Sequence, residues 1–166
     1  MRTIPLKFAM MFLLLAGTTL LAQQKNKAPV GDAQFLLQAF NGRMIATDNA
    51  KLAVRKGTTP QLRQFGKRMV KDQNEMYKAI KPLGASRNAV FPKSVNYIDP
   101  KVGNKLSKLS GPDFNRAYIN RTVADLEKDI ALFKQAATSK NKETASLAKE
   151  FLPLLEAQLT DVRQLY

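Results

Sequence analysis

Apolar residues recur at intervals of three and four along most of the chain. This is the spacing of helices that bury one face, whereas half-buried strands would alternate apolar and polar positions. Three stripes are regular and consist of Leu62, Phe65, Met69, Met76 and Ile80, of Ile119, Val123, Leu126, Ile130, Phe133 and Ala137, and of Leu147, Phe151, Leu155, Val162 and Leu165. A fourth, less regular stripe comes first in the chain and consists of Phe35, Ala39, Gly42, Ala46 and Ala53. The pattern predicts four long helices.

Capping residues and helix breakers mark the ends of these helices. Thr59 followed by Pro60 is a typical helix start, and Asp32 and Asn141 are further candidate N-caps. The predicted long helices span 32–57, 60–84, 110–138 and 141–166, and a short helix spans 99–110. Two helices, a longer connection and two further helices form the pattern of an all-α four-helix bundle with one crossover connection that contains a short helix.

The connection after the second predicted helix is long for a segment without structure of its own. It carries several apolar residues, namely Val90, Phe91, Val95, Tyr97 and Ile98. We therefore expect this connection to pack on the core of the bundle.

The N-terminus has the pattern of an export signal. Arg2 and Lys7 precede the uncharged run from Phe8 to Ala22, which is short for a membrane span. We predict a signal peptide at 1–22, a flexible leader at 23–31 and one domain at 32–166; the alternative is an uncleaved anchor helix. No Cys follows the run, which excludes a lipoprotein anchor. The pattern predicts an exported protein of the periplasm or outer membrane, with no transmembrane span in the mature chain.

The chain contains neither Cys nor His. Without these residues it has no disulfide, no thiolate nucleophile, no imidazole base and no Cys or His ligand for a metal. Most constellations of catalytic residues are therefore excluded. We predict that the protein is not an enzyme, with no catalytic residues, no cofactor and no metal site.

The chain is strongly basic, with 27 Lys and Arg against 13 Asp and Glu. Such an excess attracts polyanions, and in an exported protein the expected partner is an anionic envelope component, a lipid head group or a polysaccharide. The alternative is that the charge serves solubility alone. The candidate polyanion-binding residues lie on one face of the second predicted helix and on the short helix, and they are Lys67, Lys71, Lys78, Lys81, Lys101, Lys105 and Lys108. Nucleic acid is disfavoured, because the chain has no Trp and no aromatic residues interleaved with the basic ones.

Two glutamines occupy positions where the stripes would place a hydrocarbon. Gln73 completes the spacing between Met69 and Met76, and Gln158 falls between Leu155 and Val162. An unpaired buried amide costs about 1–3 kcal/mol, so each amide requires a partner. We predict that both are buried and satisfied, with the two bonded to each other as the simplest arrangement.

Four segments, "FLLQAF…KLA", "FGKRMVKDQ", "GPDFNRAYI" and "FLPLLEAQL", together resemble the bacterial domain-of-unknown-function family 4142 over about residues 32–166. The most specific motif is "RMVKDQ", which in the family typically ends in Asp-His. "DFNRAY" is similar to the family's Phe-Asp-x-x-Tyr, with Asn115 in place of the Asp. The resemblance implies an exported protein with a ferritin-like bundle, often labelled an outer-membrane protein.

The resemblance also implies where a metal site would lie and that this chain lacks its ligands. Family members typically place a Glu in the first helix and a His in each of the other three. The matching positions here are Ala46, Gln73, Leu126 and Gln158, and neither Ala46 nor Leu126 can coordinate a metal. Gln73 is thus expected to be structural packing at a former ligand position.

Carboxylates offer an alternative to the lost ligands. Asp72 and Glu75 are three residues apart, and Asp125 and Asp129 are four apart, so each pair shares a helix face. We interpret both pairs as a solvated, ion-paired surface. The sequence thus favours an exported non-catalytic protein of the cell envelope with a structural or binding role. The alternatives are a metal-binding ferritin-like protein or oxidase that uses carboxylates only and, second, a nucleic-acid binder.

Overall fold

The computed structural model describes residues 31–94 and 102–166. Its helices are α1 (Asp32–Lys56), α2 (Pro60–Ala85), α3 (Val102–Ser107), α4 (Gly111–Ala136) and α5 (Lys142–Arg163). The predicted signal peptide, most of the leader and Lys101 lie outside the described residues. Within the described ranges all regular structure is helical, which confirms the predicted fold class.

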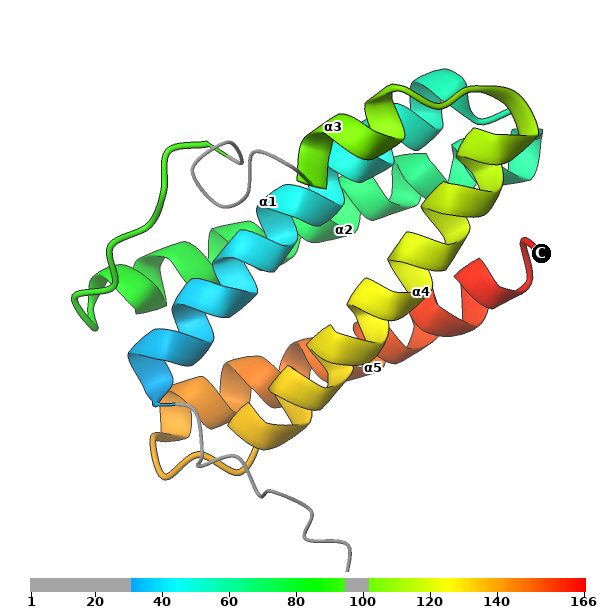
Figure 1. Cartoon of the computed structure of the whole chain (residues 1–166). Coiled ribbons are helices and arrows are strands. Elements are labelled where there is room, and N and C mark those ends of the chain that lie inside the picture. The colour runs from blue at the N-terminus through cyan, green and yellow to red at the C-terminus, as the bar shows by residue number, and fades with distance from the viewer. Residues whose placement is uncertain (1–30, 95–101) are drawn as a thin grey trace, which may run out of the picture.

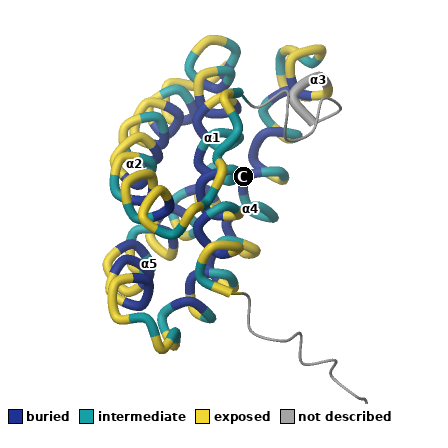
Figure 2. The backbone as a smooth tube through the Cα atoms, turned by 90° about the vertical axis from the view of Figure 1, so that its left-hand side faces the viewer, coloured by how far each residue is buried: buried dark blue, intermediate teal, exposed yellow. Residues whose placement is uncertain are grey.

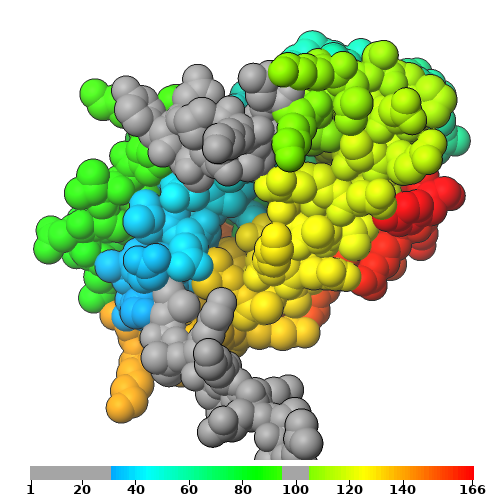
Figure 3. Space-filling view, in the orientation of Figure 1, coloured from blue at the N-terminus to red at the C-terminus, as the bar shows by residue number. Residues whose placement is uncertain are grey.

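The four long helices form a bundle made of two hairpins (Figure 1). In the bundle α1 contacts both α2 and α4, and α5 likewise contacts α2 and α4. The connection from α2 to α4 contains α3 and returns to the end of the bundle at which α2 begins, so α2 and α4 run in the same direction. This is the predicted ferritin-like bundle with one crossover. In Figure 3 the side chains of α1 and α4 meet along one face.

Two of the three predicted N-caps are confirmed. The Thr59 hydroxyl accepts a hydrogen bond from the Leu62 N–H at 3.2 Å, and the Asn141 side chain accepts from two backbone N–H groups at 3.1 Å each. The prediction for Asp32 is wrong, because α1 already begins at this residue. Its carboxylate instead accepts a hydrogen bond from the Ser139 hydroxyl at 2.7 Å, which ties the start of α1 to the α4–α5 turn.

Helices α1 and α2 approach each other closely at Gly66. A Cβ at this position would lie 3.0 Å from the carbonyl oxygen of Ala50 and 3.1 Å from the Cβ of Ala53. Small residues on both helices therefore allow their backbones to come together. The connection between the two helices is only residues 57–59, which keeps them antiparallel neighbours.

The predicted stripes of α2, α4 and α5 face the core, as the dark inner surfaces in Figure 2 show. Only Val123, Ala137 and Leu165 of these stripes are half-buried. The stripe predicted for α1 is partly wrong, because Gly42 and Ala46 are half-buried while Arg43 is completely buried. The buried residues of this helix are Phe35, Leu36, Ala39, Phe40, Arg43, Thr47, Asn49, Ala50 and Ala53.

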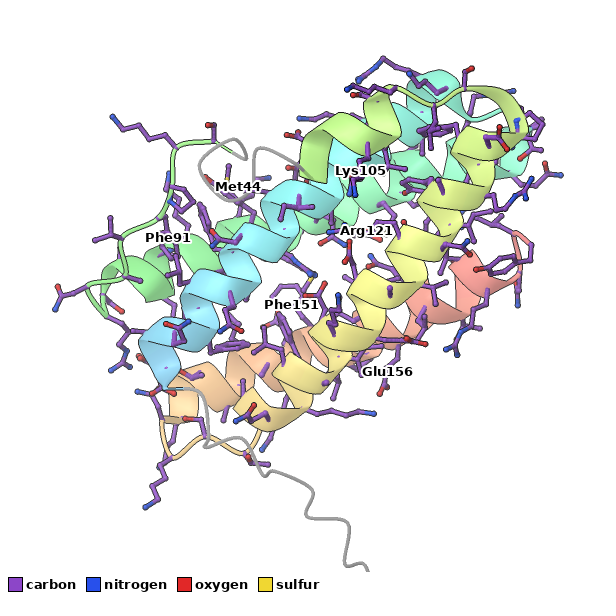
Figure 4. All side chains as sticks on the ribbon, viewed as in Figure 1. Met44, Phe91, Lys105, Arg121, Phe151 and Glu156 are labelled. Atoms are coloured by element: carbon purple, nitrogen blue, oxygen red, sulfur yellow. The ribbon has the colours of Figure 1, made fainter. Side chains whose placement is uncertain are left out.

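The connection after α2 contacts the core through a single described aromatic residue. The ring of Phe91 stacks on that of Phe40, with 4.0 Å between centroids, and fills the space that a side chain at Gly84 would need (Figure 4). The prediction for Val90 is wrong, since it is 86% exposed. Val95, Tyr97 and Ile98 lie outside the described residues.

No helix in the described part of the chain combines the length and the apolar character that crossing a membrane requires.

Candidate functional site

Four polar side chains, one from each long helix, lie in the interior of the bundle. They are Arg43 of α1, Gln73 of α2, Asp129 of α4 and Gln158 of α5, and we call them the polar layer. Arg43, Gln73 and Gln158 are buried, and the Asp129 side chain is 15% exposed. Figure 4 shows the inner and outer faces of α5, with Phe151 inside the bundle and Glu156 pointing outward.

The two glutamines of the polar layer are bonded to each other, as predicted. The Gln73 amide Nε2 donates to Gln158 Oε1 at 3.0 Å, and Gln158 Nε2 donates to the Asp72 carboxylate, also at 3.0 Å. Gln73 Oε1 is buried without a hydrogen-bond partner among the described residues. The pair therefore joins α2 to α5, and of its two amides only the Oε1 atom of Gln73 is buried without a partner among the described residues.

The second element of the polar layer is an ion pair between Arg43 and Asp129, which joins α1 to α4. Arg43 Nη1 also contacts the sulfur of Met76 at 3.3 Å, and the guanidinium lies 5.8 Å from the centre of the Phe133 ring. Gly42 leaves room for the carboxylate, because a Cβ there would lie 3.2 Å from Asp129 Oδ1. An arginine is rarely buried without such a partner, since isolated charges are costly to desolvate.

This ion pair corrects the interpretation of the acidic residues as solvated surface. Glu75 fits that interpretation, since it pairs with Lys78 in solvent at 3.2 Å. Asp125 is part-buried and pairs with Arg121 of its own helix at 2.5 Å. Asp129 does not fit, because its partner comes from another helix and is fully buried. Burial raises the pKa of Asp129, and the charge of the nearby guanidinium opposes part of that rise.

The four positions at which the family resemblance places ligands come together in the structure. Ala46, Gln73 and Leu126 line one cavity of about 20 Å³, and Gln158 is bonded to Gln73. This volume is about the room that one water molecule needs. In the described ranges no three His, Cys, Asp or Glu side chains are close enough to hold a metal ion. The carboxylates of Asp125 and Asp129 also line this cavity, and Asp129 is paired with the guanidinium of Arg43. Ala46 and Leu126 offer no atom that could bind a metal.

Tyr118 lies at the same cavity. Its hydroxyl is buried without a hydrogen bond of good geometry within the described residues. Burial raises the pKa of Tyr118, and the nearby hydroxyl of Thr122 opposes this effect. The phenol is therefore neutral at physiological pH.

The candidate polyanion-binding lysines form two separate groups. Lys67, Lys71, Lys78 and Lys81 are all exposed along α2, and we call them the α2 lysine row. Lys78 pairs with Glu75, and the Lys81 ammonium lies 5.9 Å from the Tyr77 ring centre. Lys105 and Lys108 are exposed on and just after α3, which lies on the other side of α1 from α2 (Figure 2).

The long helices of the two hairpins differ in charge. Helices α1 and α2 carry ten basic and four acidic residues, whereas α4 and α5 carry seven basic and eight acidic ones. The helices of the first hairpin thus have a net charge of +6 and the helices of the second a net charge of −1. The electrostatic potential that these helices create is therefore more positive on the α1–α2 side of the bundle.

Sequence reasoning missed a groove on the surface between α1 and α2. It has a volume of about 280 Å³ and is lined by Lys51, Val54, Arg55, Lys67 and Val70. One signal for it was present in the sequence: Lys51 and Lys67 lie equally far before and after Thr59, so a tight turn there places them opposite each other.

Comparison with solved structures gives a fold-level neighbour. A structure described as "CopM in the Ag-bound form (by soaking)" superposes with a TM-score of 0.68 at 16% sequence identity, covering 84% of this chain and 96% of that chain. At this identity the likeness concerns the fold. No curated protein matches the chain significantly. The family model described as "Domain of unknown function (DUF4142)" matches residues 17–165, and the chain therefore belongs to the DUF4142 family.

Proposed function

We propose that this chain is an exported, non-catalytic binding protein of the cell envelope, and that its α1–α2 side docks on an anionic lipid head group or polysaccharide. The observation that carries the proposal is the charge difference between the helices of the two hairpins, +6 against −1. Charge spread evenly over the molecule would serve solubility, whereas charge gathered on one side directs association.

The exposed charges of the α2 lysine row remain available to a partner. Lys67, Lys71 and Lys81 have no ion-pair partner among the described residues, and the Lys81 ammonium lies near the Tyr77 ring. The pair between Lys78 and Glu75 is exposed, and such pairs contribute about 0–1 kcal/mol. A partner's anionic groups can therefore compete for these lysines at little cost.

The non-catalytic part of the proposal is supported by the chemistry of the side chains. The chain has no His or Cys, and the polar layer uses its carboxylate and amides in contacts between helices. These groups therefore already bond to side chains of other helices. A hydrolytic or redox activity in the purified protein would contradict this part.

The proposed binding is tested with two variants of equal net charge. One replaces the α2 lysine row by Gln, and the matched control replaces Lys128, Lys140, Lys142 and Lys149, which are exposed on α4, α5 and their connection. We expect binding to anionic vesicles or acidic polysaccharide to fall about tenfold or more in the first variant only, since each lysine near an anionic surface contributes roughly 1 kcal/mol. Equal losses in both variants would mean that net charge alone is responsible.

Export is tested separately by expressing the full chain in a bacterium and determining the N-terminus of the protein recovered from the periplasm and outer membrane. Cleavage after Ala22 gives a mature chain that begins at Gln23. Retention of the intact chain in the inner membrane would support the anchor-helix alternative instead.

A second candidate function is binding of a soft metal ion, favoured by the silver named in the description of the structural neighbour. Soft ions prefer sulfur, and the thioethers of Met69 and Met76 lie beside the polar layer. The Arg43 charge opposes a cation there. Dialysis against silver, copper, iron, manganese, nickel and zinc ions, followed by metal analysis, decides the matter. One ion retained per chain and lost in Met69→Leu would favour this candidate.

A further inference from the structure

We propose that the groove between α1 and α2 binds one molecule of an anionic lipid, with its acidic head group between the basic side chains and the start of its hydrocarbon on the two valines. This inference rests on the proposed function and narrows the partner from any envelope polyanion to a lipid. It concerns a site that the sequence did not reveal.

The floor of the groove is apolar. Val54 and Val70 are half-buried and face the groove from α1 and α2 respectively. The floor lies next to the close approach of the two helices at Gly66, where a Cβ would be 3.1 Å from the backbone nitrogen of Val54. This contact fixes the spacing of the helices, so the groove is present without a ligand.

The rim of the groove is basic. Lys51 pairs with Asp48 at 3.0 Å, but both side chains are about half exposed, which makes the pair weak. Arg55 and Lys67 have no acidic partner among the described residues. A guanidinium presents two parallel N–H donors to a phosphate or carboxylate, while a lysine acts as a point charge. The rim thus offers one directional contact and two positive charges to a single anionic group.

The size of the groove suits a head group with a short length of chain. Its volume of about 280 Å³ is about nine times the roughly 30 Å³ that one water molecule occupies in the liquid. A phosphate fills part of this space, and the remainder holds a few methylene groups in contact with the valines. Burial of each of these methylene groups adds hydrophobic free energy to the binding.

The lining of the groove favours a lipid over the other polyanions. Its five residues include no aromatic side chain on which a nucleobase could stack. A polysaccharide or free phosphate could use the rim, but neither has a hydrocarbon to cover Val54 and Val70. Since Lys67 also belongs to the α2 lysine row, a lipid held in the groove would bring that row to the membrane surface.

The inference is tested by titrating the full mature chain with dihexanoyl phosphatidylglycerol below its micelle concentration, while NMR follows the methyl signals of Val54 and Val70. Dihexanoyl phosphatidylcholine and inorganic phosphate are titrated in parallel. We expect saturable shifts of both valines with the anionic lipid, at least tenfold weaker binding of the zwitterionic lipid, and no valine shifts with phosphate. Equal binding of both lipids would overturn the proposal, because the rim charge would then have no role.

Two sets of variants separate the floor from the rim. Val54→Thr with Val70→Thr keeps every charge, and we expect it to weaken binding of the anionic lipid roughly tenfold by removing apolar contact. Arg55→Gln with Lys67→Gln should weaken binding roughly thirtyfold, from about 1 kcal/mol per charge. The control Lys142→Gln with Lys149→Gln has the same net charge as the rim variant and should bind as the unchanged chain does.

Failure of this inference is distinguishable from failure of the proposed function. Vesicles containing phosphatidylglycerol that bind the rim variant as well as the Lys142 and Lys149 control would overturn the groove and leave the proposed function standing. Binding of acidic polysaccharide without binding of the short-chain lipid would do the same. A chain that binds neither vesicles nor polysaccharide at low salt would overturn both.

Discussion

The two hairpins of the bundle are built alike inside and differ outside. Each consists of two long helices that bury apolar stripes against the other hairpin. With the buried pair of Arg43 and Asp129 set aside, the helices α1 and α2 have a net charge of +5 and the helices α4 and α5 a net charge of 0. The core therefore does not require the asymmetry. Since packing does not require this difference, it supports the proposed binding of an anionic partner to the α1–α2 surface.

Basic side chains in the interior and on the surface also differ, namely in whether they have an acidic partner. Arg43 of the basic hairpin is buried and has Asp129 of the other hairpin as its partner. Arg55 and Lys67 are exposed and have no acidic partner among the described residues. The buried charge of Arg43 is thus compensated, whereas the exposed charges of Arg55 and Lys67 are left available to a partner.

The largest effect is expected from breaking the buried ion pair that joins the hairpins. Asp129→Leu leaves the Arg43 charge buried without a partner, and we expect it to lower the free energy of unfolding by about 3–5 kcal/mol. Denaturant unfolding followed by circular dichroism measures the loss.

The double variant Arg43→Met with Asp129→Leu is the control for this prediction. It removes both charges and should recover most of the lost stability, because apolar residues of similar volume replace a buried pair at little net cost. A double variant as unstable as Asp129→Leu would show that shape rather than charge is critical at this position.

A smaller effect is expected at the second link between the hairpins. Gln158→Leu removes the partner of the Gln73 amide and the donor to Asp72, and we expect a loss of about 1–3 kcal/mol. The double variant Gln73→Leu with Gln158→Leu should be more stable than the single one in the same denaturant measurement. If Gln158→Leu is neutral, then the amide pair is not a link that the bundle depends on.

The smallest effect is expected at a link on the surface. Arg68 of α2 pairs with Asp161 of α5 at 3.1 Å, with both side chains about half exposed. We expect Arg68→Gln to change the stability by less than about 1 kcal/mol, and less still in high salt. A thermal-unfolding comparison at two salt concentrations checks this, and a loss comparable to that of Gln158→Leu would contradict the contrast between buried and exposed links.

The bundle was predictable because three helices have regular apolar stripes. Burial of Gln73 and Gln158 followed from their place in those stripes, and their mutual bond followed from the cost of leaving a buried amide unpaired. The phase of α1 was not predictable in the same way. Its inner face includes Arg43 and Thr47, and polar residues at such positions shift the apparent stripe toward Gly42 and Ala46.

The ion pair and the groove depend on contacts that no local pattern records. Asp129 lies 86 residues after Arg43, and nothing in its own helix distinguishes it from Asp125. The groove requires Lys51 and Arg55 of α1 to lie beside Lys67 of α2, at a distance set by small residues in the helix crossing. The spacing of residues along one helix identifies a shared face of that helix only. It could therefore predict the α2 lysine row but not a groove built from two helices.

The short connection between α1 and α2 has a consequence for the order of folding. Only residues 57–59 separate these helices, so their contacts are local, whereas contacts between the hairpins close much longer loops. We therefore expect the first hairpin to form before α4 docks on it, and the guanidinium of Arg43 to lose its water only in that last step. We therefore expect loss of the Asp129 carboxylate to accelerate unfolding and to leave the folding rate nearly unchanged. Slow separation of the second hairpin from the first would then limit the rate at which the bundle unfolds.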